Sequence, residues 1–215
     1  MTTDRVERML AWAGIAAGVL YASKFAFNGM PDSTYAGDAA AYVHSHEAQN
    51  GVVFIATGLA ALLIVLFTTG LRARLRSGEG AESTYSSIAY AGGVLLAGAM
   101  LLRACMMIAA LDATTTHDAA SVKVISVVSA DLWLPWIGAT CLLLLGVGLG
   151  GLRNAVLPRW LSWTSLVLAV LCVLGPAGIL VDLVMPVWLV VTASIVLRGR
   201  PVEAPREAVA VATLG

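Results

Sequence analysis

The chain has 215 residues, of which 59% are hydrophobic and only 12% are charged, and its mean hydropathy is +0.86. A soluble domain carries about 25% charged residues, so this composition excludes a soluble enzyme, a disordered chain and a nucleic-acid-binding protein. Thirteen basic residues balance 13 acidic ones, so no net field steers a charged partner. The composition predicts an all-α integral membrane bundle.

Six apolar stretches follow one another, and each is interpreted as one membrane crossing. The predicted spans are 9–27, 51–71, 85–111, 133–152, 161–175 and 178–197. The last two divide one run of 37 residues, 161–197, because Gly175-Pro176-Ala177-Gly178 is a turn signal. The first run is about 19 residues long, longer than the 7–15 apolar residues of a secretory signal peptide, so we expect it to remain as a span.

The basic residues predict the orientation of these spans. Ten of the 13 fall on one side of the membrane in this scheme: Arg5, Arg8, Arg72, Arg74, Arg76, Arg153, Arg159, Arg198, Arg200 and Arg206. Because Lys and Arg near span ends mark the cytoplasmic side, both termini are predicted to be cytoplasmic. Residues 1–200 then form one six-helix domain, residues 72–84 a flexible inner loop, and residues 201–215 a disordered cytoplasmic tail.

The two longer outer loops each contain a candidate surface helix. Asp38 is placed to cap a short helix that continues to about Gln49, and the segment 118–131 is interpreted in the same way. Glycines occur within the spans at Gly92, Gly93, Gly98, Gly146, Gly148, Gly150 and Gly151. In apolar helices such residues allow close backbone approach, and no phosphate-binding loop is indicated.

Four ionisable residues lie in or beside the predicted spans. Lys24, Arg103 and Asp182 fall in the outer half of the bilayer, and Asp131 lies at the mouth of the fourth span. A charge in mid-membrane costs about 2.5–3.5 kcal/mol, so such groups face the bundle interior or a wet cavity. We expect Arg103 and Asp182 to form the central pair, because a guanidinium presents a planar fork to a carboxylate. Lys24 is expected to reach Asp182 or Asp131, or to extend to the headgroups.

This cluster leaves several functions open. It is either a structural ion pair or an outward-facing polar pocket that binds or moves a small apolar or amphipathic molecule. The alternatives are an intramembrane enzyme for a lipid- or terpenoid-like substrate, with Asp131 or Asp182 as acid, and a small subunit of a membrane complex. No nucleophile or cofactor motif occurs. A metal site at His44-Ser45-His46-Glu47 with His117 is disfavoured, because residues i and i+2 do not share a helix face.

Several short stretches resemble a group of uncharacterised actinobacterial multi-pass membrane proteins. They are Tyr42-Val43-His44-Ser45-His46, Gly70-Leu71-Arg72-Ala73-Arg74-Leu75, Ala89-Tyr90-Ala91-Gly92-Gly93, Leu157-Pro158-Arg159-Trp160-Leu161 and the Gly175-Pro176 hairpin. The resemblance covers roughly residues 9–198 and consists of the hydropathy pattern and the residues at turns and span ends. It implies a six-helix bundle in a bacterial plasma membrane and transfers no catalytic residue.

Overall fold

The structure, a computed structural model, describes residues 3–27, 38–79, 83–115, 119–175 and 177–198. All secondary-structure elements in these ranges are α-helices. They are α1 (Thr3–Ala26), α2 (Ala39–Ser45), α3 (Glu47–Glu79), α4 (Thr84–Thr115), α5 (Ala119–Asp131), α6 (Trp133–Asn154), α7 (Arg159–Val173) and α8 (Ala177–Arg198). The predicted tail, residues 201–215, lies outside the described residues.

The described helices confirm a multi-pass helical membrane protein. Five stretches are long and apolar enough to cross a membrane: Arg5–Ala26, Glu47–Glu79, Thr84–Thr115, Ala120–Asn154 and Ala177–Arg198. The shorter apolar helix α7 has 15 residues, about 22 Å of rise. Gly175 separates α7 from α8 with φ +62°, a left-handed conformation that favours glycine, so the predicted hairpin at this point is present.

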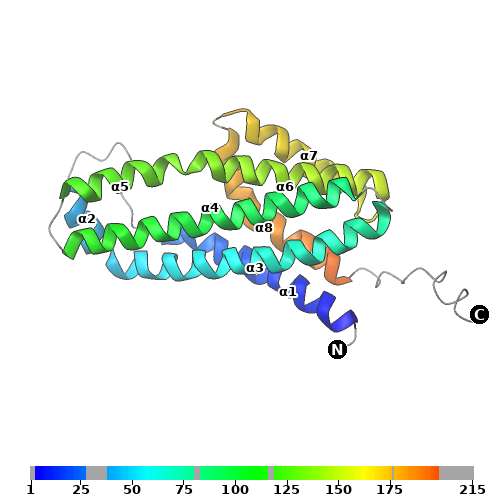
Figure 1. Cartoon of the computed structure of the whole chain (residues 1–215), viewed down its shortest axis with the longest axis horizontal. Coiled ribbons are helices and arrows are strands. Elements are labelled where there is room, and N and C mark those ends of the chain that lie inside the picture. Colours follow the sequence, from blue (N-terminus) through cyan, green and yellow to red (C-terminus); the bar gives the residue numbers. More distant parts are fainter. Residues whose placement is uncertain (1–2, 28–37, 80–82, 116–118, 176, 199–215) are drawn as a thin grey trace, which may run out of the picture.

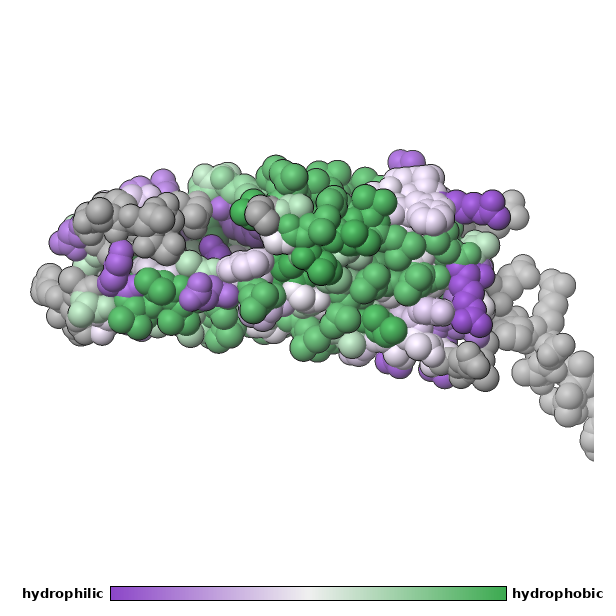
Figure 2. All heavy atoms as spheres, turned by 90° about the horizontal axis from the view of Figure 1, so that it is seen from above, coloured by the Kyte–Doolittle hydropathy of each residue, from purple (hydrophilic) through white to green (hydrophobic). Residues whose placement is uncertain are grey.

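Both described ends of the chain lie at the same end of the bundle (Figure 1). The end of α3, the start of α4 and the connection from α6 to α7 lie there too (Figure 1). Hydrophilic residues gather at this end, beside a broad apolar surface (Figure 2). Eight described arginines occur in the helix segments at this end: Arg5, Arg8, Arg72, Arg74, Arg76, Arg153, Arg159 and Arg198. We call it the arginine-rich end. Because both ends of the described chain lie at this one end, the arrangement fits an even number of membrane crossings.

The opposite end of the bundle carries a helical head. It consists of α2, α5, the first turns of α3 and the last turns of α4, and it extends past the α7–α8 hairpin (Figure 1). A separate apolar core joins these four segments through Val43, Val53, Met107, Ala110 and Val122. Helix α3 has 33 residues, about 50 Å of rise, whereas the hydrocarbon core is about 30 Å thick. The first turns of α3, which belong to the head, account for part of this excess length.

The predicted close approach of helices through glycine is present between α4 and α6. A Cβ atom on Gly92 would overlap the backbone of Leu143, and one on Gly146 would overlap the backbone of Ala89. These two positions let the backbones touch, as small residues do in membrane bundles. Gly98 differs from this prediction, because nothing lies within 4 Å of the site where its Cβ would be.

Two predicted boundaries are wrong. Residues 72–79 continue helix α3 rather than forming a flexible loop, since Leu71 and Leu75, four residues apart, are both buried against the core. The Glu79 carboxylate at the end of α3 accepts hydrogen bonds from the Ser86 backbone amide and hydroxyl, both at 2.8 Å. The helix capped by Asp38 ends at Ser45 instead of Gln49, and α3 begins two residues later.

Candidate functional site

An ion pair joins the last turn of α1 to the second turn of α8. The Nζ atom of Lys24 donates to both carboxylate oxygens of Asp182 at 2.7 Å. Their side chains are 13% and 23% exposed, so most of both charged groups is removed from solvent. Pro186 follows Asp182 by one helical turn within α8, and a proline offers no amide hydrogen to the carbonyl four residues earlier. Helix α8 therefore lacks one backbone hydrogen bond at this site.

Aromatic residues surround the ammonium group of Lys24. Its Nζ atom lies 4.2 Å from the ring centroid of Trp136, 4.4 Å from that of Tyr21 and 4.8 Å from that of Phe25. These distances are within the range of cation–π attraction, which strengthens when the cation is desolvated. The three rings and the carboxylate together hold the lysine inside the bundle, so it does not extend to the headgroups.

A hydrogen-bonded chain supports the carboxylate from a second direction. The Tyr21 hydroxyl donates to Asp182 Oδ1 at 2.6 Å, and Trp136 Nε1 donates to the same Tyr21 hydroxyl at 2.7 Å. Tyr21 and Trp136 are both buried, and their rings meet edge to face at 5.5 Å. The chain thus connects α6, α1 and α8 through polar atoms that would be costly to leave unpaired in an apolar interior.

A cavity of about 510 Å³ opens beside this ion pair. Its lining residues come from α1, α4, α5, α6 and α8 and from the connections at Leu132 and Gly175: Lys24, Arg103, Ala130, Leu132, Trp133, Trp136, Ile137, Gly175, Ile179 and Asp182. Three of the ten are charged, and the rest are apolar, aromatic or small. The volume is in the range of small-molecule sites, which combine apolar walls with a few polar groups. Figure 2 shows a hollow with hydrophilic residues beside the apolar surface.

The structure corrects the predicted central pair. Asp182 pairs with Lys24, and among the described residues Arg103 forms no ion pair within 4.0 Å. The physical reason is helix placement, because α8 packs along α1, which brings Lys24 to the carboxylate. Arg103 instead reaches the cavity from α4.

The fourth predicted residue, Asp131, is not part of this cluster. Its side chain is exposed at the end of α5, and its neighbours Ala130 and Leu132 line the cavity instead. Sequence reasoning singled out neither Tyr21 nor Trp136 as a site residue. The spacing of Tyr21 and Lys24 could have revealed the first, since residues i and i+3 share a helix face.

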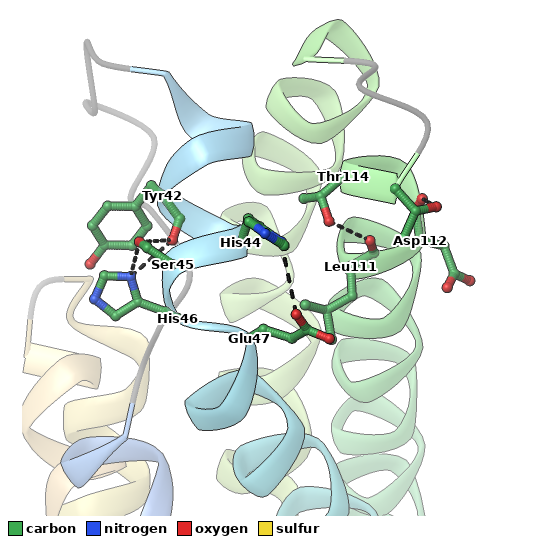
Figure 3. Close-up of polar contacts among 9 residues, drawn as sticks. Tyr42, His44, Ser45, His46, Glu47, Leu111, Asp112 and Thr114 are labelled. Atoms are coloured by element: carbon green, nitrogen blue, oxygen red, sulfur yellow. Dashed lines mark hydrogen bonds and ion pairs between the residues drawn. The ribbon is translucent and has the colours of Figure 1, made fainter.

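The head contains a second cavity, of about 630 Å³, between α2 and α4. Figure 3 shows His44 and Glu47 facing the end of α4 that carries Asp112 and Thr114. The His44 Nδ1 atom lies 3.8 Å from Glu47 Oε2, and both side chains are exposed. Asp38, also in the lining, accepts hydrogen bonds from the backbone amides of α2 that it caps. His44 and Glu47 in this cavity are thus exposed to solvent, and Asp38 is engaged by the helix that it caps.

The histidines predicted not to bind metal have local contacts. His46 Nδ1 lies 2.9 Å from the Tyr42 carbonyl and 3.0 Å from the Ser45 hydroxyl, and its ring stacks on Tyr42 (Figure 3). His117 lies outside the described residues. Within the described part of the chain, no group of three or more His, Cys, Asp or Glu side chains has a geometry that could hold a metal ion.

Comparisons of the chain with protein-family models, with curated proteins and with solved structures found no match. Function is therefore inferred from the cavity and its charges.

Proposed function

We propose that this chain is an actinobacterial plasma-membrane protein that binds or moves a small apolar or amphipathic molecule through the cavity beside Lys24 and Asp182. The observation that carries the proposal is the composition of the lining, in which three charged side chains stand among apolar walls. An apolar wall accepts a hydrocarbon portion, and the charged groups orient a polar portion. The proposed partners are the lipid bilayer and this one small hydrophobic ligand.

The position of the cavity supports access from the membrane. Its rim includes Gly175 and Ile179 of the α7–α8 hairpin, and Ile179 is 72% exposed. Helix α7 rises about 22 Å from the arginine-rich end, less than the thickness of a hydrocarbon core of about 30 Å. If that end is cytoplasmic, as the arginines predict, the rim lies at the depth of the outer leaflet. A ligand dissolved in that leaflet would then enter the cavity laterally from the membrane.

An acid role for Asp182 is a weaker proposal. Oδ1 of Asp182 accepts from Tyr21 and Lys24, and Oδ2 accepts from Lys24. A proton donor at this position would require Lys24 to move away from the carboxylate. Asp131, the other acid considered, is exposed and outside the cavity lining. Binding is thus the function that the geometry supports best.

Filling the cavity tests the proposal. In Ala130→Trp an indole replaces a methyl group on the cavity wall, whereas Val124→Trp places the same ring on α5 at a residue that is 63% exposed. Protein in lipid nanodiscs would be illuminated with a photoactivatable twelve-carbon alcohol, and the labelled peptides would be mapped by mass spectrometry. We expect labelling of the lining in the wild type and in Val124→Trp, and its loss in Ala130→Trp. Equal labelling of all lipid-facing helices in the three proteins would contradict the proposal.

A further inference from the structure

The three charged side chains of the cavity do not balance one another. Lys24 and Arg103 contribute two positive charges, and Asp182 contributes one negative charge. Asp182 is engaged by Lys24 at 2.7 Å through both oxygens. Arg103 is half-buried, and no hydrogen bond or ion pair joins its guanidinium to another described residue. The three groups therefore carry a net charge of +1, and Arg103 is the one without a directly bonded partner among the described residues.

A guanidinium without a directly bonded partner is costly in a membrane span, and its chemical complement is well defined. A charged side chain within a span is kept where it pairs with another group or serves a ligand. Guanidinium has five donors in a planar fork that fits the two oxygens of a carboxylate or phosphate group. The acidic residues Asp38, Glu47 and Asp112 line the second cavity, in the head, and not the cavity that contains Arg103.

We infer that the ligand of this cavity is an amphipathic anion and that Arg103 binds its carboxylate or phosphate group. The inference rests on the proposed function and names its ligand class. The hydrocarbon portion lies against Trp133, Ile137 and Ile179, which form apolar walls of the same cavity. The Lys24–Asp182 pair, held by Tyr21 and Trp136, is the fixed polar wall beside the anion. Lys24 is already neutralised, so the anion is assigned to Arg103.

Charge-matched probes test this assignment. Four photoactivatable twelve-carbon probes would carry a carboxylate, a phosphate, a hydroxyl or a trimethylammonium group, and each would be titrated against protein in phosphatidylcholine nanodiscs. Hydrogen bonds to charged groups contribute about 1.5–3 kcal/mol, which is roughly ten- to a hundredfold in affinity. We expect the wild type to prefer both anions over the alcohol by about tenfold or more, and Arg103→Gln to abolish this preference while still binding the alcohol.

Two further variants separate geometry from charge. Arg103→Lys keeps the charge and removes the planar fork, so we expect an intermediate preference for the anions. Arg76→Gln makes the same chemical change as Arg103→Gln at an exposed residue of the arginine-rich end, and we expect it to behave as the wild type. Anion labelling in Arg103→Gln at the wild-type affinity overturns the inference.

The design distinguishes failure of the two proposals. Equal labelling of the lining by the alcohol and the anions in the wild type overturns the anion assignment alone. Absence of lining labelling by all four probes overturns the proposed function and this inference together. Replacing phosphatidylcholine by phosphatidylglycerol then identifies the source of the anion. Competition with the probes indicates an anionic membrane lipid, and unchanged probe binding indicates a free amphipathic acid or phosphate.

Discussion

The hydroxyl of Tyr21 lies 2.6 Å from a carboxylate oxygen of Asp182, although 161 positions separate the two residues in the chain. This contact joins the first and the last described helix of the bundle. One turn after Tyr21 on α1, Lys24 reaches the same carboxylate. Helix α1 thus holds Asp182 with two side chains on one face, a phenol and an ammonium.

The Lys24–Asp182 pair should show strong energetic coupling. We expect Asp182→Leu to lower the free energy of unfolding by about 2–4 kcal/mol. This is somewhat below the loss for a fully enclosed pair, because both side chains keep some exposure. The double change Lys24→Met with Asp182→Leu should recover much of the loss, since it leaves no unpaired charge. Thermal unfolding of the purified protein in detergent measures both effects. Strict additivity of the two single changes would show that the pair contributes no coupling.

The same set of single and double changes, made with Arg103 in place of Lys24, provides the control. Arg103→Leu combined with Asp182→Leu still leaves Lys24 without its carboxylate, so we expect no comparable recovery. A recovery as large as that of the Lys24 double mutant would restore Arg103 as the partner of Asp182.

Removing the Tyr21 hydroxyl should destabilise the bundle without changing its shape. Tyr21→Phe leaves Trp136 Nε1 without its acceptor, and a buried unsatisfied polar group costs about 1–3 kcal/mol. Tyr90→Phe removes a hydroxyl from the ring that faces Arg72 and retains the ring, so its effect should be within about 0.5 kcal/mol. The comparison is made by thermal unfolding of both variants. Equal melting temperatures would argue against an energetic role for the Trp136–Tyr21–Asp182 chain.

Alanine at two glycines of α4 should have effects of opposite sign. Gly92→Ala places a methyl group into the backbone of Leu143, and overpacking costs about 1–3 kcal/mol. Gly98→Ala meets open space and removes the helix penalty of glycine, about 0.5–1 kcal/mol. We expect the first variant to melt below the wild type and the second at or above it. A stable Gly92→Ala protein would contradict the close α4–α6 contact.

The orientation of the bundle can be tested by labelling from outside the cell. Ser45 and Ser77 are both exposed. Single cysteines at these positions would be introduced after replacement of Cys105, Cys141 and Cys172. An impermeant maleimide should label the cysteine at position 45 in intact cells, and the cysteine at position 77 only after lysis. Equal labelling of the two in intact cells would contradict the predicted cytoplasmic termini.

Hydropathy was sufficient to predict most of the fold. The start of α6 at Trp133 and the α7–α8 hairpin at Gly175 follow from apolar length and turn chemistry. The continuation of α3 through residue 79 could not be predicted in this way. It depends on Leu75 being buried against other helices, which hydropathy along one segment does not reveal.

The candidate site was predicted in its members but not in its pairing. The predicted spans placed Lys24, Arg103 and Asp182 at a similar depth in the membrane, and the three residues do line one cavity. Which of them touch depends on the rotation of each helix about its axis and on which helices are neighbours. Neither quantity follows from distance along the chain, so Arg103 was assigned a carboxylate that Lys24 holds.

The separation of Lys24 and Asp182 by 158 positions in the sequence also has a consequence for biosynthesis. At about 5–20 residues per second, a ribosome needs roughly 8–30 s to reach Asp182 after it has made Lys24. During that interval the ammonium group of α1 exists without its carboxylate. A chain that ends before α8 lacks this carboxylate, so the stabilisation of α1 by the Lys24–Asp182 pair comes only with the last described helix.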